Sequence, residues 1–207
     1  MMIKSQIWVA GFAAAAVYFI CTGIAFSHYP LAYSPSANWL SDLGNPLVNP
    51  SGALSYNLGC ILSGLCLVFF YLGLDIWAGG EDKHRYLLTI AQATGILSSL
   101  CLIVSAFFPL GPQTLIHSIA GKGHIFFAGF FLTFSATVLL RKAQPSKWLA
   151  YFGFLTAGVN FIYGAFLHAV FAAEWAAIGA LILYILLISG SSLKPSARRA
   201  AVRLGQR

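Results

Sequence analysis

Charged residues are scarce in this chain. Asp, Glu, Lys and Arg make up 8% of its 207 residues, and five of these side chains are acidic. Soluble domains carry about 25% charged residues. Together with a hydrophobic content of 59% and a mean hydropathy of +0.81, this deficit argues against a sizeable soluble domain. The composition instead indicates an integral membrane protein.

Cysteine is also scarce, and the common motifs of catalytic and metal sites are missing. The four cysteines fall in apolar segments and form no CxxC pair, which is typical of packing residues rather than of a disulfide or metal framework. They are Cys21, Cys60, Cys66 and Cys101. The chain has no HExxH and no GxSxG, and the run from Gly121 to His124 is only a fragment of a phosphate loop. A hydrolase triad of Ser41, Asp42 and a histidine stays open, because spacing alone does not define a triad.

Long apolar runs are what the chain has in quantity. Each is close to the roughly 20 residues that a helix needs to cross a bilayer. They predict an all-α fold, a polytopic bundle of six transmembrane helices in one domain over residues 1–193, followed by a basic tail over residues 194–207. The predicted helices span about residues 7–27, 53–77, 86–108, 117–140, 147–168 and 173–190. Small residues at four-residue spacing, Gly59/Ser63 and Cys60/Gly64, predict close packing of the second helix.

The basic residues predict the orientation of this bundle. With the N-terminus inside, eleven of the twelve Lys and Arg fall in cytoplasmic segments, which leaves Lys122 outside. The positive-inside rule therefore predicts a multi-pass protein of the cell membrane, the cytoplasmic membrane if the source is bacterial, with both termini in the cytoplasm. Membrane lipids are the expected partners, and the tail over residues 194–207 would be attracted to anionic headgroups. Nucleic acid is not an expected partner, and a homo-oligomer stays open.

The first predicted outer segment, residues 28–52, is neither apolar enough to span a bilayer nor strongly charged. It holds four of the eight prolines and one charged residue, Asp42. Ser34 can cap a short helix with Pro35 at its first position, and Gly44 can end that helix. We therefore expect a structured first extracytoplasmic loop that lies on the outer end of the bundle.

Polar side chains gather at this outer end of the predicted topology. Ionisable groups at membrane depth are costly, which makes them candidates for function. Several also share one side of the fifth predicted helix, where Thr156, Asn160, Tyr163, Gly164 and His168 follow helical spacing. We predict a polar site under residues 28–52, without assigning catalytic residues. Its candidate ligand-binding residues are Asp42, Ser41, Asn57, His117, His124, Asn160, Tyr163 and His168.

The chemistry of this site has several interpretations. The leading one is binding of a lipid or small ligand without a cofactor. The alternative is a metal-dependent lipid hydrolase or transferase at the outer leaflet, with zinc held by His117, His124, His168 and Asp42. On an unbroken helix His117 and His124 lie about 10 Å apart along the axis, so they could share an ion only if the helix breaks at Gly121–Gly123. A weaker alternative is a b-type haem held by His124 and His168, and the competing structural interpretation is a hydrogen-bonded packing cluster.

Short motifs in the first loop also carry a family resemblance. They are His28-Tyr29-Pro30, Tyr33-Ser34-Pro35 and Leu40-Ser41-Asp42-Leu43-Gly44, joined by Asn57-Leu58-Gly59 and by Phe108-Pro109 before His117 and His124. With them the chain resembles a family of six-helix prokaryotic membrane proteins, the domain of unknown function 998. It is more remotely similar to the damage-regulated autophagy modulators, whose Ser-Asp-Gly run is matched by Ser41, Asp42 and, displaced by one residue, Gly44. The resemblance implies six helices and a functional first loop, and it supplies no reaction.

Overall fold

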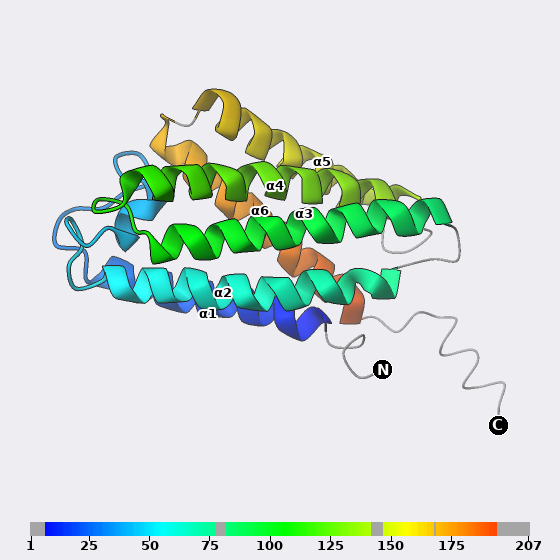
Figure 1. Cartoon of the computed structure of the whole chain (residues 1–207), viewed down its shortest axis with the longest axis horizontal. Coiled ribbons are helices and arrows are strands. Elements are labelled where there is room, and N and C mark those ends of the chain that lie inside the picture. Colours follow the sequence, from blue (N-terminus) through cyan, green and yellow to red (C-terminus); the bar gives the residue numbers. More distant parts are fainter. Residues whose placement is uncertain (1–6, 78–81, 142–146, 168, 194–207) are drawn as a thin grey trace.

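Six long helices form the framework of the molecule. The computed structural model describes residues 7–77, 82–141, 147–167 and 169–193. Within these ranges six helices are long and apolar enough to cross a membrane, and they lie alongside one another in Figure 1. They are α1 (Ile7–Ser27), α2 (Ala53–Gly73), α3 (Asp82–Phe107), α4 (Thr114–Leu140), α5 (Lys147–Ile162) and α6 (Phe171–Leu193). The predicted all-α membrane bundle is confirmed.

Three short helical segments join or extend the long helices. The 3-10 helix η2 (Leu40–Gly44) lies in the loop between α1 and α2, and η3 (Leu74–Trp77) extends α2. The π-helical turn η4 (Tyr163–Leu167) extends α5. The sequence predicted α5 to run to residue 168, so the change of helix type is a departure from that expectation. Because a π turn holds an extra residue, it changes which side chains share a face with those of α5.

The start of α4 also differs from the prediction. It begins at Thr114, before the expected residue 117, where the Thr114 hydroxyl accepts the Gly111 N–H at 3.1 Å. Gly111 has a φ of +96°, a left-handed conformation that glycine adopts without steric cost. From Thr114 the helix runs unbroken to Leu140, through Gly121 and Gly123. The helix break that would have brought His117 and His124 to one ion is therefore not formed.

The six long helices pack in a ring. Side chains fill the interior of this ring in one half of the bundle, which we call the solid half. Each long helix contacts its neighbours in sequence, and α6 returns to contact α1. In the half away from η2, large aromatic side chains fill the centre. The rings of Tyr71 and Phe131 lie 4.6 Å apart, and Tyr184 packs on Phe131 at 6.2 Å. All three side chains are fully buried. The core of the protein is therefore concentrated at this end of the bundle.

Residues 28–52 cover the other end of the bundle, and we call this segment the cap. The helix that the sequence predicted from Pro35 to Gly44 is wrong in its first half: residues 35–37 form a turn, and helical structure begins at Leu40. The turn starts as a helix would, because the Ala37 and Asn38 N–H groups both donate to the Ser34 carbonyl. It goes no further, because the Trp39 N–H donates to the Asp42 carboxylate at 3.0 Å instead of to a carbonyl of the turn. Trp39, in extended backbone, then separates the turn from η2.

Small residues bring α1, α2 and α3 close together. A Cβ added at Gly59 of α2 would overlap the Cys21 Cβ of α1, and one at Gly64 would lie 2.6 Å from Ile103 of α3. Ser63 donates its hydroxyl to the Ala14 carbonyl of α1 at 2.9 Å. These contacts agree with the close packing that the small-residue spacing predicted.

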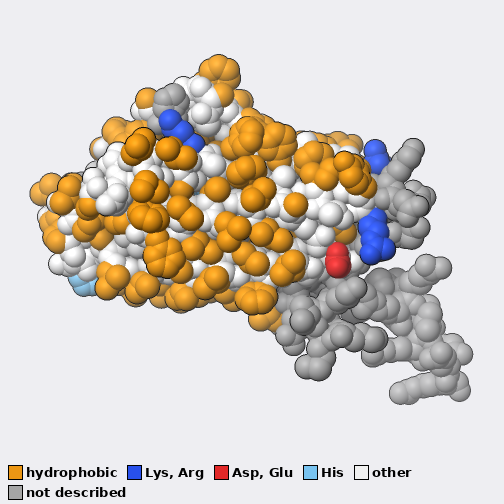
Figure 2. All heavy atoms as spheres, in the orientation of Figure 1, with side chains coloured by type: hydrophobic (Ala, Val, Ile, Leu, Met, Phe, Trp, Pro, Cys, Tyr) orange, Lys and Arg blue, Asp and Glu red, His pale blue; other side chains and the backbone are white. Residues whose placement is uncertain are grey.

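Apolar side chains cover the face of the bundle shown in Figure 2, while basic side chains gather at the end opposite the cap. Arg85 and Lys147 lie in the first turns of α3 and α5, and Arg141 follows the last residue of α4. Lys122, in the cap half of α4, is an exposed exception. This distribution agrees with the charge bias of the sequence; the assignment of that end to the cytoplasm stays a prediction.

The close approach at Gly59 generates a stability prediction. Leucine at this position must push α1 and α2 apart, and such overpacking costs about 1–3 kcal/mol. We expect Gly59→Leu to lower the unfolding temperature in detergent by about 2–4 °C for each kcal/mol. The matched control is Gly179→Leu in α6, where an added Cβ meets no heavy atom within 4 Å. Equal unfolding temperatures for the two variants would contradict the packing described for α1 and α2.

Candidate functional site

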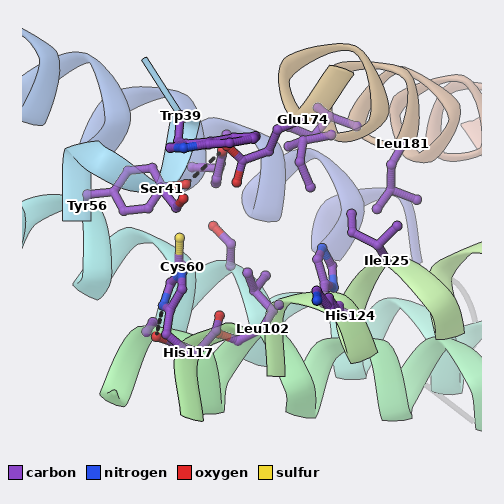
Figure 3. Close-up of a pocket in the computed structure, with 18 of the residues that line it drawn as sticks. Trp39, Ser41, Tyr56, Cys60, Leu102, His117, His124, Ile125, Glu174 and Leu181 are labelled. Atoms are coloured by element: carbon purple, nitrogen blue, oxygen red, sulfur yellow. Dashed lines mark hydrogen bonds between the residues drawn. The ribbon is translucent and has the colours of Figure 1, made fainter. Parts of the chain in front are cut away.

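A cavity of about 350 Å³ lies between the helices, directly beneath the cap. Its walls come from α1, α2, α3, α4 and α6, with η2 above it and η4 at one side. Figure 3 looks into this cavity, with Trp39 and Glu174 on one side and His117 and His124 on the other. The predicted site under residues 28–52 thus coincides with a hollow in the bundle.

The cavity has an apolar end and a polar end. Leu67, Leu181 and Ile185 line it and also belong to the packed core of the solid half. Ser41 of η2 and Glu174 of α6 line it next to the cap. Because apolar and polar walls face the same cavity, the arrangement suits a ligand that has both an apolar and a polar part.

Glu174 connects the cap to α6. One oxygen of its carboxylate accepts the Leu40 N–H at 2.6 Å, and the backbone N–H and hydroxyl of Ser41 also hydrogen-bond this carboxylate. On the next residue, the Trp175 indole N–H donates to the Asn38 carbonyl at 3.2 Å. The bonds to the carboxylate are charge-assisted, and such hydrogen bonds are shorter and stronger than the neutral bond from Trp175. They hold η2 in position over the cavity.

His117 and His124 of α4 are each oriented by a hydrogen bond from the imidazole ring to a backbone carbonyl of α3. Nδ1 of His117 lies 2.8 Å from the Ser105 carbonyl, and Nδ1 of His124 lies 3.1 Å from the Ser98 carbonyl. A carbonyl only accepts, so each Nδ1 carries the hydrogen in a neutral ring and each Nε2 holds a lone pair. Both residues line the cavity. The α4 wall therefore offers two hydrogen-bond acceptors of fixed orientation.

The metal and haem interpretations find no complete ligand set in the described part of the chain. No group of three His, Cys, Asp or Glu side chains within it could hold one metal ion. His117 and His124 lie seven residues apart on an unbroken helix, about 10 Å along its axis. His168, which both interpretations require, lies outside the described residues. The zinc and haem sites therefore stay predictions from the sequence.

The other predicted site residues divide into two groups. Ser41, Asn57 and Tyr163 line the cavity together with the two histidines, whereas Asp42 and Asn160 are not among the lining residues. Asn57 donates its amide to the Gly44 carbonyl at 2.8 Å, and so holds the end of η2. Five of the eight candidates thus meet at one cavity.

The predicted stripe on the fifth helix is split by the π turn. Thr156 and Asn160 of α5 are buried outside the cavity wall, while Tyr163 and Gly164 of η4 line it. The Asn160 amide donates to the Thr156 carbonyl of its own helix at 2.9 Å. Its Oδ1 is buried without a hydrogen-bond partner among the described residues. We have no functional role for this oxygen.

Sequence reasoning missed several residues of the cavity wall. Glu174 is not among the candidates selected from the sequence, although an acidic residue at the start of an apolar helix is itself a strong indication. Trp39 and Tyr56 line the cavity with aromatic rings, and Lys122 lines it while exposed. Lys122 could have been found as the one basic residue outside the predicted cytoplasmic segments. Nothing in the sequence marks Tyr56.

The Asp42 side chain forms a hydrogen bond within the cap. Its Oδ2 accepts the Trp39 N–H at 3.0 Å, at the start of η2. Burial raises the pKa of Asp42 above the ordinary value, and the hydrogen bond from Trp39 opposes this shift. The folded protein therefore binds the Asp42 proton more tightly than the unfolded chain does. It follows that ionising Asp42 makes the folded state less stable as the pH rises.

Asp42→Asn tests this pH dependence, because the amide oxygen still accepts the Trp39 N–H but no longer titrates. The unfolding temperature of the variant minus that of the wild type should increase as the pH is raised from below 3.8, the ordinary aspartate pKa, to neutral. Once Asp42 is ionised in both states, the difference should level off. The measurement is thermal unfolding of both proteins in a non-ionic detergent. A difference that decreases with pH would show that the carboxylate stabilises the cap.

Comparison with known proteins supports the family resemblance that the sequence indicated. No curated protein and no solved structure matches the chain. The similarity to the damage-regulated autophagy modulators accordingly stays a prediction. A family model described as "Protein of unknown function (DUF998)" matches residues 12–194, which is most of the chain. The chain belongs to this DUF998 family.

Proposed function

We propose that this protein binds a membrane amphiphile, a lipid or a similar single-chain molecule, in the cavity beneath the cap. The observation that carries the proposal is the cavity itself. Its volume of about 350 Å³ falls within the roughly 300–1,000 Å³ of small-molecule sites. An engineered void of about 150 Å³ already holds benzene. A headgroup or a segment of an acyl chain fits within such a volume.

The polarity of the walls supports an amphiphile over a wholly polar solute. Leu102, Leu181 and Ile185 supply apolar wall. Ser41 and Glu174 supply hydrogen-bonding groups next to the cap. An acyl chain against the leucines and isoleucine would exclude water there, and a polar headgroup would meet the groups at the cap.

The exposed lining residues support entry from the side of the bundle. Lys122 of α4 and Gly164 of η4 both line the cavity and are both exposed. Lys122 lies about 12 Å along α4 from its first residue, a depth that corresponds to the membrane rather than to water. Gly121, beside it, also lines the cavity, and an added Cβ there would meet no heavy atom within 4 Å. A mouth between α4 and η4 would therefore open toward lipid.

The positive-inside rule predicts which leaflet of the membrane contains the cavity. Arg85, Arg141 and Lys147 lie at the end of the bundle opposite the cap. Placing that end in the cytoplasm puts the cap, the cavity and its mouth in the outer leaflet, with both termini inside. In this orientation the long Lys122 side chain can reach up to the headgroup region while its stem stays in lipid.

Narrowing the mouth tests the proposal. We expect wild-type protein in detergent to bind one molecule of 1-palmitoyl-lysophosphatidylethanolamine, and Gly121→Leu to weaken this binding by about tenfold or more. The matched control is Gly158→Leu in α5, where an added Cβ also meets no heavy atom within 4 Å but which is not a lining residue. Native mass spectrometry counts the bound molecules, and titration gives the affinities. Absence of stoichiometric binding to wild type, or equal binding to both variants, would overturn the proposal.

A further inference from the structure

We infer that the cap end of this cavity recognises an ammonium group, so that the ligand is an amphiphile with an amine-bearing headgroup. The inference rests on the proposed function, because it names the ligand class of the same cavity. Three lining residues carry it: the carboxylate of Glu174 and the aromatic rings of Trp39 and Tyr56. Together they form a site of the kind that binds an organic cation.

Glu174 brings an acidic group to the cavity wall without a basic partner. Leu40 and Ser41 donate hydrogen bonds to it, and no Lys or Arg among the described residues forms an ion pair with it. A carboxylate removed from water is costly unless a charge of opposite sign accompanies it. An ammonium group bound next to Glu174 would supply that charge.

Two aromatic rings lie at the same end of the cavity as this carboxylate. Figure 3 shows the Trp39 ring edge-on beside Glu174, with the Tyr56 ring on the other side of Ser41. Trp39 is held by Phe171, whose ring centroid is 4.5 Å away, and the Tyr56 hydroxyl lies 3.5 Å from that of Tyr18. A cation near the face of Trp or Tyr is attracted by the ring, and the attraction grows when water is excluded.

The opposite wall complements a group that donates hydrogen bonds. Nδ1 of His117 and of His124 is held at a carbonyl of α3. Each Nε2 is then an acceptor, and a primary ammonium group carries three N–H donors. Lys122, exposed at the mouth of the cavity, has the charge to pair with a phosphate. The cavity therefore offers hydrogen-bond acceptors and a carboxylate in its interior and a cation at its entrance. This arrangement matches a headgroup that joins an amine to a phosphate.

A matched pair of lipids tests the inference on the wild-type protein. 1-Palmitoyl-lysophosphatidylethanolamine and 1-palmitoyl-lysophosphatidylglycerol share the acyl chain and the phosphate, and the first alone carries an amine. We expect the amine lipid to bind about tenfold more tightly. Equal affinities, or a preference for the glycerol lipid, would overturn the ammonium site while leaving the proposed lipid binding intact. Failure of both lipids to bind would overturn the proposed function and this inference together.

Glu174→Gln separates recognition from the structural role of this residue. The amide oxygen can still accept the Leu40 N–H, whereas part of the hydrogen bonding from Ser41 is lost, so the unfolding temperature should fall by about 2–4 °C while the fold is kept. The preference for the amine lipid should be lost, whereas Asp42→Asn, which changes a carboxylate that does not line the cavity, should retain it. A preference that survives in Glu174→Gln would assign this carboxylate to holding the cap alone.

Competition with free ethanolamine tests whether the ammonium group belongs to a lipid headgroup or to a water-soluble amine. If the natural ligand is a lipid, ethanolamine at equal concentration should not displace bound 1-palmitoyl-lysophosphatidylethanolamine, because it lacks the acyl chain that the apolar wall contacts. Displacement by ethanolamine at that concentration would keep the ammonium site but assign it to a water-soluble amine, and would contradict the amphiphile.

Discussion

The structure depends on how the backbone of the cap obtains its hydrogen bonds. Residues 28–52 are mostly irregular, and irregular backbone next to an apolar bundle must find partners because unsatisfied groups there are costly. Side chains from the cap and the helices supply them. Asn49, fully buried, donates to the carbonyls of Ala25 and Leu43, Asn57 of α2 donates to Gly44, and Glu174 of α6 accepts from Leu40. These bonds fix η2 over the ring of helices.

The fixed cap covers the hollow half of the bundle, and the solid half lies on the far side of the cavity. Tyr71, Phe131 and Tyr184 fill the centre of the solid half, and all three are fully buried. Around the cavity the walls include short side chains instead, among them Ala14, Ala15, Ser63 and Ala106. Short side chains on several helices leave a volume that no neighbour fills. A cavity with polar walls of this kind holds water or a ligand rather than vacuum.

The sequence predicted the architecture well because hydrophobic length and charge bias are local properties. Six apolar runs are enough to place six helices, and no knowledge of packing is required. The site was harder to predict because its residues come from five long helices, from the short segments η2 and η4, and from the loops beside them. His117, His124, Asn57 and Tyr163 could be found from their polarity in apolar helices, and the same criterion applies to Glu174. That α6 places Glu174 against Leu40 is a contact that only the structure shows.

Two errors of the sequence reasoning have physical causes that only contacts reveal. The helix predicted from Pro35 stops after one turn because the Trp39 N–H donates to the Asp42 side chain instead of to a carbonyl of that turn. The stripe on the fifth helix was split because a π turn at Tyr163 alters the register. In both cases a local pattern was interpreted as regular α-helix, and a side-chain bond or an extra residue in the turn changed it.

The carboxylate of Glu174 accepts hydrogen bonds from the Leu40 N–H and from the backbone and hydroxyl of Ser41. A glutamine, with one acceptor oxygen, would not replace all of them. These bonds offset part of the cost of placing a carboxylate in the wall of an apolar bundle, and the proposed cation on the cavity side would offset more of it. Because one carboxylate faces both the cap backbone and the cavity, any cation bound there acts on the group that holds η2. Occupancy of the cavity and the position of the cap are then thermodynamically linked, and each must influence the other to the same degree.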